Sequence, residues 1–496
     1  MADTRTSTER RADHGAAPAP DSRRWLGLAV ISVAQLMVAL DATIMNIALP
    51  SAQRALGVSD ADRQWVITGY TLALAGLLLL GGRVADYLGR KRAFLIGLIG
   101  FAAGSALGGA AVNLGMLVFG RALQGAFAAI LTPTALSLLA VTFTEPKERG
   151  RAFAVYGAIA SSGGAVGLLL GGALTEYSSW RWCMYVNVAI GVLAALAGVA
   201  YLVDAKVPGR PRFDVLGVLL VTAGLVSVVY ACSRAVTSGW SSSEVVGLLV
   251  AGGALLTLFV LWEARAANPL LPLRIVWDRN RGGTCIAAGC AVVGMLGMFL
   301  LLTYYFQVVL QYPPLKAGLA FLPLTLAVAF SAFGVASPLL PRVPPRLLIV
   351  PGLVVTAAGL LVLTQLEVGS SYLSHTLPAE ILLGAGLGCV VTPAFSVATQ
   401  GVDRRETGVA AATVNTAQQV GGSLGVALLN TIAASATVAY LAGSSIHDGD
   451  AVARALVHGY TRAIGWGAGI LLVAALLAAV LINAPRPAPH GSTASR

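Results

Sequence analysis

Two charged residues lie inside apolar stretches of this 496-residue chain and have the chemistry needed to hold and release a proton. A charge at the centre of a bilayer costs about 2.5–3.5 kcal/mol on insertion scales, so Asp41 and Arg121 are expected to face a cavity or a partner. Counted at about 1.5 Å per residue, each lies roughly 10–12 Å from the same side of the membrane, so an ion pair between them is predicted. Arginine keeps its proton, which leaves Asp41 as the titrating member. A purely structural ion pair is the alternative.

A loop between the second and third apolar stretches carries four cations and one carboxylate within eleven residues. So many charges cannot lie in hydrocarbon, and loops this cationic stay on the cytoplasmic side. Two glycines permit a sharp turn, and the charges can bridge to neighbouring helix ends. We predict a conformational latch, the alternative being a solvated turn that sets only topology. Its residues are Gly82, Asp86, Gly89, Arg90 and Lys91.

Glycines recur every four residues in the fifth apolar stretch, at Gly163, Gly167 and Gly171, and Gly172 follows the last of them. Small residues at this spacing allow two membrane helices to pack closely. Close packing is expected for most of this stripe. We also expect packing at this seam to influence which side of the protein opens.

Polar and aromatic side chains in other apolar stretches are candidates for lining a substrate cavity. Joining helices or facing lipid is an equal alternative for several of them. These candidates are Asn46, Gln124, Tyr304, Tyr305, Gln307, Asn415 and Gln418.

The sequence shows no motif for an enzyme, a metal site or an ATP-driven motor. A P-loop requires Gly-Lys followed by Ser or Thr, and none of the four lysines lies in that context. The five cysteines lie in or beside apolar stretches without a framework spacing, and no histidine pairs at a metal-ligand spacing. We therefore predict neither a catalytic residue nor a cofactor, with a proton gradient as the source of energy.

The elements that must position these residues are membrane-spanning helices. The chain is 57% hydrophobic and only 11% charged, which excludes a soluble protein of this length. We predict an all-α polytopic membrane protein with fourteen spans, and Pro50 falls in a proposed connection. The spans are 25–49, 64–82, 93–112, 114–142, 151–174, 181–203, 214–233, 244–263, 284–310, 317–340, 346–366, 377–400, 408–434 and 462–484.

The distribution of charge orients these spans. With the N-terminus inside, the cytoplasmic segments hold 25 Lys or Arg and the outer segments hold 7. This bias predicts that both termini, 1–24 and 485–496, are cytoplasmic and that 435–461 lies outside. The net charge of +11 therefore does not indicate nucleic-acid binding. Arginine greatly outnumbers lysine, which is typical of bacteria with GC-rich DNA and favours a bacterial plasma membrane.

An internal repeat divides the chain. Thr132-Pro133 is matched 260 residues later by Thr392-Pro393, and a Gly-Gly-x-x-Gly pattern at 163–167 is matched 258 residues later at 421–425. Two parallel six-helix bundles are therefore predicted at 25–203 and 284–484. Residues 204–283 would hold two inserted helices.

The chain resembles the fourteen-span drug:proton antiporter branch of the major facilitator superfamily over about residues 25–484. The resemblance is carried by Leu-Asp-Ala-Thr at 40–43, the latch loop, Arg-Ala-Leu-Gln-Gly at 121–125, the glycines at 157–172, Ser-Trp-Arg-Trp at 179–182 and Gln-Gln-Val-Gly-Gly at 418–422. It implies roles in proton coupling for Asp41 and Arg121 and an antiporter motif in the fifth helix. That motif normally has proline where Leu168 stands.

We therefore predict a monomeric exporter that exchanges amphiphilic small molecules, such as antibiotics, for protons by alternating access. The alternatives are a uniporter or importer of another solute, and a non-transporting sensor or assembly protein on a transporter scaffold. The partners expected are the small-molecule substrate, protons and the lipid bilayer.

Overall fold

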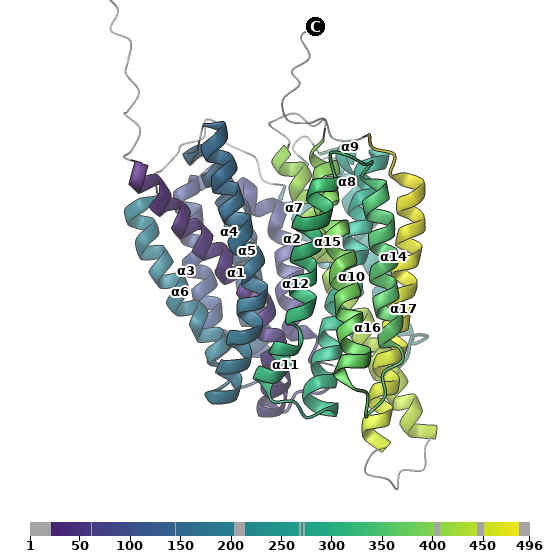
Figure 1. Cartoon of the computed structure of the whole chain (residues 1–496). Coiled ribbons are helices and arrows are strands. Elements are labelled where there is room, and N and C mark those ends of the chain that lie inside the picture. Colours follow the sequence, from purple (N-terminus) through teal and green to yellow (C-terminus); the bar gives the residue numbers. More distant parts are fainter. Residues whose placement is uncertain are drawn as a thin grey trace, which may run out of the picture.

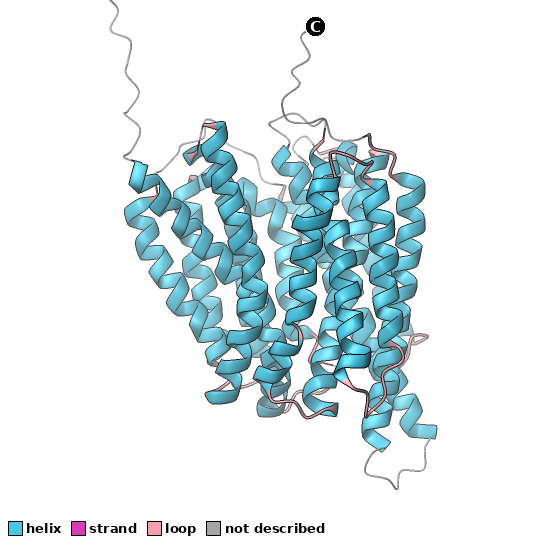
Figure 2. Ribbon diagram, viewed as in Figure 1, coloured by secondary structure: helices cyan, strands magenta, loops and turns pink. Residues whose placement is uncertain are grey.

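The computed structural model describes residues 21–60, 62–143, 145–202, 214–266, 269–270, 273–400, 407–443 and 451–485. Throughout these ranges the regular structure is helical, and Figure 2 shows helices joined by loops without a strand. The all-α class predicted from the sequence is thus confirmed.

Six long helices form the first half of the molecule. They are α1 (Asp21–Leu56), α2 (Trp65–Leu88), α3 (Arg90–Gly109), α4 (Leu114–Thr142), α5 (Pro146–Tyr177) and α6 (Trp182–Tyr201).

The second half contains three π-helical segments, η1 to η3, besides its α-helices. Its elements are α10 (Arg279–Tyr304), η1 (Tyr305–Val309), α11 (Pro314–Ala320), α12 (Leu322–Phe330), η2 (Ser331–Ala336), α13 (Ser337–Leu339), α14 (Arg346–Leu363), η3 (Tyr372–Thr376), α15 (Leu377–Thr399), α16 (Thr407–Gly443) and α17 (Ala451–Leu481).

Helices α7 (Val215–Ser238) and α8 (Ser243–Glu263) separate the halves in sequence, and the short α9 (Leu273–Val276) follows them. Leu225 and Val229 of α7 pack with Leu72 of α2 and Ala427 of α16. In addition, the Thr431 hydroxyl of α16 donates to the carbonyl of Cys232 at 2.9 Å. The inserted pair therefore contacts a helix from each half.

The expected number of spans agrees with the structure. Thirteen helices of the described chain are long and apolar enough to cross a membrane, and α2 adds a shorter apolar stretch at Trp65–Leu78. Several boundaries differ from the sequence prediction by a few residues, as where α2 continues past 82 to Leu88, and two differences are larger. Helix α1 continues through Pro50 to Leu56 and ends where Gly57 adopts a φ of +63°. The amide of Val58 then donates to the carbonyl of Gln53, so the glycine, and not the proline, ends this helix.

The second difference concerns the predicted outer segment 435–461. All of its described residues are helical, because α16 continues to Gly443 and α17 begins at Ala451. Residues 444–450 lie outside the described ranges. In Figure 1 these two helix ends project beyond the rest of the molecule, on the side away from the chain ends.

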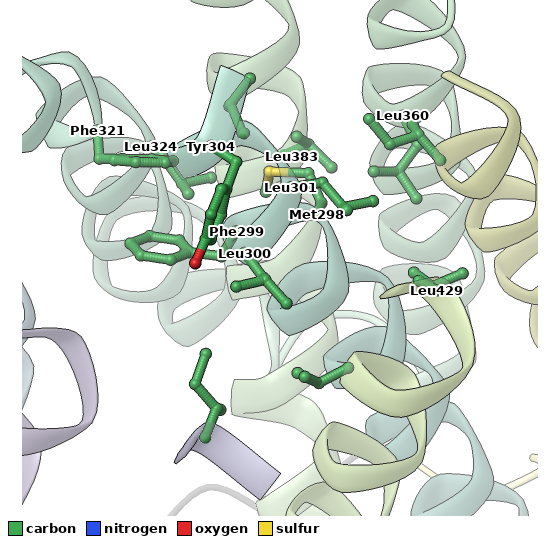
Figure 3. Close-up of a cluster of buried hydrophobic side chains, with 14 of the residues drawn as sticks. Met298, Phe299, Leu300, Leu301, Tyr304, Phe321, Leu324, Leu360, Leu383 and Leu429 are labelled. Carbon is green, nitrogen blue, oxygen red and sulfur yellow. The ribbon is translucent and has the colours of Figure 1, made fainter. Parts of the chain in front are cut away.

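The core of the second half is apolar and rich in aromatic rings. Phe299 of α10 stacks on Phe321 with ring centroids 4.1 Å apart. Leu324 of α12 and Leu383 of α15 belong to the same buried cluster (Figure 3). This packing holds α10, which carries Tyr304 toward the first half.

The halves lean toward each other at one end only. In Figure 1 the helices of the first half converge with those of the second on the side away from the Asp21 end of α1 and the Leu481 end of α17. We call the side with these chain ends the terminal face, and the other side the far face.

Candidate functional site

Asp41 and Arg121 meet in the interior of the first half. The Nη1 atom of Arg121 lies 2.5 Å from Oδ2 of Asp41, and the two residues are 1% and 0% exposed. Oδ1 of Asp41 accepts from Nε2 of Gln124 at 2.9 Å and from Nδ2 of Asn187 at 2.7 Å. Helices α1, α4 and α6 thus contribute to a single buried polar network.

Arg121 is held by further partners. Its Nε donates to the carbonyl of Val66 at 3.1 Å, and its Nη1 also contacts Oε1 of Gln124 at 2.9 Å. The guanidinium carbon lies 4.4 Å from the ring centroid of Tyr70, a cation–π distance. These contacts hold the Arg121 guanidinium in place beside the Asp41 carboxyl group.

The local sequence explains why these side chains converge. Arg121 and Gln124 are three residues apart on α4 and therefore share one helix face. On that helix Gly120 allows α3 to approach so closely that a Cβ would lie 2.8 Å from the Gly108 amide nitrogen. Ser105 of α3 then accepts from Nε2 of Gln124 at 2.6 Å. Small residues thus bring the helices close enough for the polar groups to meet.

The glycine stripe of α5 packs against the part of α1 that carries Asp41. A Cβ on Gly163 would lie 2.6 Å from the Ala39 side chain, and one on Gly167 would lie 2.1 Å from Oγ1 of Thr43. Gly171 meets Ile44 in the same way, so the close packing expected of the stripe is present. Gly172 has a different neighbour, because its Cβ would lie 2.6 Å from Cα of Leu315 in the second half. Helix α5 thus touches both the Asp41 helix and the opposite half.

The hydrogen bonds around Asp41 match an ionised carboxylate. Arg121, Gln124 and Asn187 all present N–H groups to its two oxygens. A charged group removed from water needs such compensation. In this conformation three N–H groups thus compensate the charge that an ionised Asp41 would carry.

A second buried arginine joins the two halves at the far face. Arg63, 3% exposed, precedes α2, and its Nε donates to Oδ1 of Asn430 on α16 at 3.1 Å. Its guanidinium carbon lies 3.7 Å from the Tyr304 ring centroid of α10, and Nη1 pairs with Asp60 at 3.1 Å. The Tyr304 hydroxyl in turn hydrogen bonds to Gln53 of α1. Arg63, Asn430 and Tyr304 are thus buried together between the halves.

Other contacts between the halves lie in the same region. Ser423 of α16 donates to the Thr71 hydroxyl at 2.7 Å, and Gln307 donates to the carbonyl of Ile47 at 2.9 Å. The Leu315 amide donates to Glu176 of α5 at 3.0 Å.

At the terminal face, two bonds of the described residues each lie within one half. Lys91 donates to the Val199 carbonyl and Arg281 to the Gln400 carbonyl. This conformation is therefore closed at the far face by direct bonds between the halves.

The latch residues lie at the terminal face, between α2 and α3. Gly89 alone separates the two helices, with a φ of +88° that favours glycine, so the predicted sharp turn is present. Lys91 donates to the carbonyl of Val199 in α6 at 2.8 Å, and Arg90 is half-buried. The surroundings of Gly82 and of the Asp86 side chain fall outside what the structure describes. The predicted contact between the Asp86 carboxylate and a neighbouring helix end therefore stays a prediction.

The cavity candidates do not form one cluster. Gln124 belongs to the Asp41 network, and Asn46 bonds to its own helix at the Ala42 carbonyl. Tyr304 and Tyr305 are 2% and 1% exposed, so in this conformation they are packed between helices and line no open cavity.

The remaining cavity candidates lie elsewhere. Gln307 bridges the halves at the Ile47 carbonyl, whereas Asn415 and Gln418 are half-buried on α16. A pocket of about 410 Å³ lies apart from all of these residues, between α14 and α17.

Sequence reasoning missed several members of these networks. Glu380 is an ionisable residue within an apolar stretch, so the criterion that selected Asp41 would have found it. Asn187 is an uncharged polar residue of the same kind as the cavity candidates Asn46 and Gln124. Arg63 lies just before the predicted span 64–82, so the sequence indicates only an outer-segment cation. No local signal shows that its side chain turns inward, because its partner Asn430 is 367 residues away in sequence.

Comparison with known proteins agrees with this architecture. The family model described as Major Facilitator Superfamily matches residues 31–426. A puromycin resistance protein of Streptomyces alboniger is 53% identical over 95% of this chain and 94% of its own. A cephamycin export protein of Amycolatopsis lactamdurans is 38% identical over 86% and 88%.

Among solved structures, a bacterial homologue of the human lysosomal transporter Spinster, in an inward-facing and occupied conformation, superposes with a TM-score of 0.67. It is 15% identical, with coverage of 94% of this chain and 97% of the other, so it shows the fold alone. The helical architecture, the family match and the similarity to these relatives lead to one conclusion. The chain belongs to the Major Facilitator Superfamily and is a multi-pass membrane transporter, not an enzyme.

Proposed function

We propose that this protein exports amphiphilic small molecules, of the kind represented by antibiotics, in exchange for protons across a bacterial plasma membrane. The buried Asp41–Arg121 network is the observation that carries the proton-coupled part. Relatives described as antibiotic resistance or export proteins, similar over most of this chain, support the substrate class.

The network offers Asp41 a way to exist in both protonation states. As a carboxylate it accepts three N–H groups, as the structure has it. Oδ1 of Asn187 is buried without a hydrogen-bond partner, so rotation of that amide would turn an acceptor toward a protonated Asp41. Protonation would also remove the charge that pairs with Arg121, whose remaining partners are Val66, Gln124 and Tyr70.

The arrangement of contacts supports alternating access between the halves. Because the contacts of Arg63 close the far face, an opening in this conformation would lie on the terminal side. An exporter must also adopt the opposite state, in which these far-face bonds are broken. We expect the latch loop and the α5 seam to bias that equilibrium within a single chain.

The orientation in the membrane is our first prediction. In a cysteine-free background, a single cysteine in place of Ser241, exposed between α7 and α8, should react with an impermeant thiol reagent from outside the cell. A cysteine in place of Tyr87, 55% exposed beside Gly89, should react only from the cytoplasm, because cation-rich loops stay inside. Labelling of both from one face would contradict this topology.

The proposed function predicts efflux driven by a proton gradient. Inside-out vesicles with the protein should accumulate puromycin when their interior is acidified, and a protonophore should abolish the accumulation. Vesicles lacking the protein are the control. Accumulation insensitive to the protonophore would favour a uniporter, and a chain that moves none of a panel of antibiotics would favour a sensor on this scaffold.

A further inference from the structure

A second buried carboxyl group lies in the other half of the molecule. Glu380, 0% exposed, is in the first turn of α15, which continues η3 without a break. Within the described ranges no Lys, Arg or His comes within salt-bridge distance of it. Its Oε1 atom is buried without a hydrogen-bond partner. This environment is the reverse of that of Asp41, which faces an arginine and two amides.

The contacts of Tyr372 indicate the protonation state of Glu380. The tyrosine hydroxyl lies 2.8 Å from the carbonyl oxygen of Ala320 and 3.2 Å from Oε2 of Glu380. A hydroxyl has one hydrogen to donate, and a carbonyl can only accept. If the hydrogen goes to the nearer carbonyl, the contact with Glu380 is a hydrogen bond only when the carboxyl group carries the proton. Both contacts are therefore satisfied by a neutral Glu380.

Among the residues that the structure describes, no cation pairs with the Glu380 carboxyl group to stabilise its ionised form. The Tyr372 ring lies 6.1 Å from that of Phe306, which packs on Phe321 at 5.3 Å. Of the neighbouring ionisable groups, Lys316 lies over the Tyr312 ring.

Two other polar groups of this region are also occupied elsewhere. The Tyr305 hydroxyl donates to the Glu367 carbonyl, and His375 contacts Ser374. A helix N-terminus favours a carboxylate by only about 0.3–1 kcal/mol, whereas an unpaired buried charge costs several kcal/mol.

The internal repeat relates Glu380 to the site already described. Thr132-Pro133 in α4 corresponds to Thr392-Pro393 in α15, an offset of 260 residues, and both prolines lie inside their helices. At this offset Arg121 corresponds to position 381, one residue from Glu380. Each half thus holds a buried ionisable residue at nearly the same place in its fourth helix, a cation in one and an acid in the other.

We propose that Glu380 is a second proton-binding site of this transporter, in the second half, separate from the Asp41 network. The inference rests on the proposed exchange of drug for protons. When the far face opens, the Glu380 carboxylate takes a proton from hydronium, leaving water. The acid keeps this proton while the halves close, as described here, and later gives it to water on the cytoplasmic side. Arg346, at the start of α14, donates to the Ala479 carbonyl near the terminal end of α17, so the other end of α14 and the connection to η3 and α15 place this site near the far face.

Infrared spectroscopy of the purified protein in nanodiscs tests the protonation state directly. At neutral pH the wild type should show the C=O stretching band of a protonated carboxyl group. Glu380→Gln should lack this band, and Asp41→Asn should retain it. In Tyr372→Phe the band should shift, because the O–H group loses its acceptor, and this variant serves if Glu380→Gln does not fold. A Glu380→Gln spectrum identical to that of the wild type, or no shift in Tyr372→Phe, would overturn the inference.

The number of protons exchanged tests the role in transport. In proteoliposomes, the slope of the logarithm of the puromycin accumulation ratio against the imposed pH difference gives the protons moved per molecule. The slope should fall by one in Glu380→Gln. An unchanged slope would overturn the second site, and an unchanged slope with a raised KM would assign the carboxyl group to binding cationic drugs. If the wild-type slope is itself zero, the proposed exchange fails, while the infrared result still reports on Glu380.

Discussion

Replacement of Asp41 by asparagine should abolish uphill efflux while leaving substrate binding in place. The change removes the only titrating group of the network and places an amide where Arg121, Gln124 and Asn187 all donate N–H groups. The new NH₂ group would face a donor and could not exchange a proton. The measurement is gradient-driven efflux in vesicles together with equilibrium binding of puromycin. Glu244→Gln, which changes an exposed acid of the inserted helices in the same way, is the matched control.

The pair should also behave as one unit in stability. Removing one partner of a buried ion pair strands the other and typically costs about 3–5 kcal/mol. Asp41→Asn and Arg121→Gln should each be less stable than the wild type, and the double variant should be no worse than the poorer single one. Thermal unfolding in detergent, analysed as a double-mutant cycle, measures this coupling. Strictly additive losses would mean that the contact contributes nothing, and uphill efflux surviving in Asp41→Asn would move proton coupling elsewhere.

Replacement of Arg63 by methionine should shift the protein toward the conformation that is open at the far face. The variant loses a charge-assisted hydrogen bond to Asn430, worth about 1.5–3 kcal/mol, and a buried cation–π contact with Tyr304. Since about 1.4 kcal/mol corresponds to a factor of ten, the equilibrium between closed and open far face should change at least tenfold. Asp60 is not stranded, because its side chain is 60% exposed.

A cysteine pair across the far face reports this shift. Glu176 of α5 and Leu315 of α11 touch between the halves, so cysteines at these positions should be bridged by a short bifunctional thiol reagent in the closed state. Arg63→Met should slow this cross-linking and lower transport. Arg54→Met is the matched control, because Arg54 lies in the same connecting region but bonds only to Pro50 and Ser51 of its own helix. Equal cross-linking in Arg63→Met and the wild type would make Arg63 a support for its loop and not a closure of the far face.

The two carboxyl groups suggest how one conformation can hold different protonation states in its two halves. Asp41 is surrounded by donors, whereas Glu380 has a tyrosine hydroxyl as its only described partner. The surroundings of Asp41 stabilise the charged form of a carboxyl group, whereas those of Glu380 stabilise the neutral form. The two groups would therefore release their protons at different stages of a transport cycle. The prediction for Glu380 and that for Asp41 can therefore fail independently.

Much of this protein is determined by its sequence alone. Apolar runs of about twenty residues can satisfy their backbone groups in a membrane only as helices, so the fourteen spans follow from composition and length. The contact between Asp41 and Arg121 also follows, because their depths agree and an intramembrane charge needs a partner. The repeat at an offset near 260 residues indicates the two halves. All of these inferences depend on position along a helix, which the sequence states directly.

Only the tertiary structure decides what surrounds each of these residues. Arg63 reads as a solvated charge of an outer segment, yet it is buried because Tyr304 and Asn430, far away in sequence, close over it. The sequence predicts Tyr304 as a cavity residue, but its ring packs against Arg63 and is buried. The same holds for Glu380, whose neutral state depends on Tyr372 and on the carbonyl of Ala320 in another helix. The rotation of each helix about its axis sets these contacts, and that rotation is fixed only when all the helices pack together.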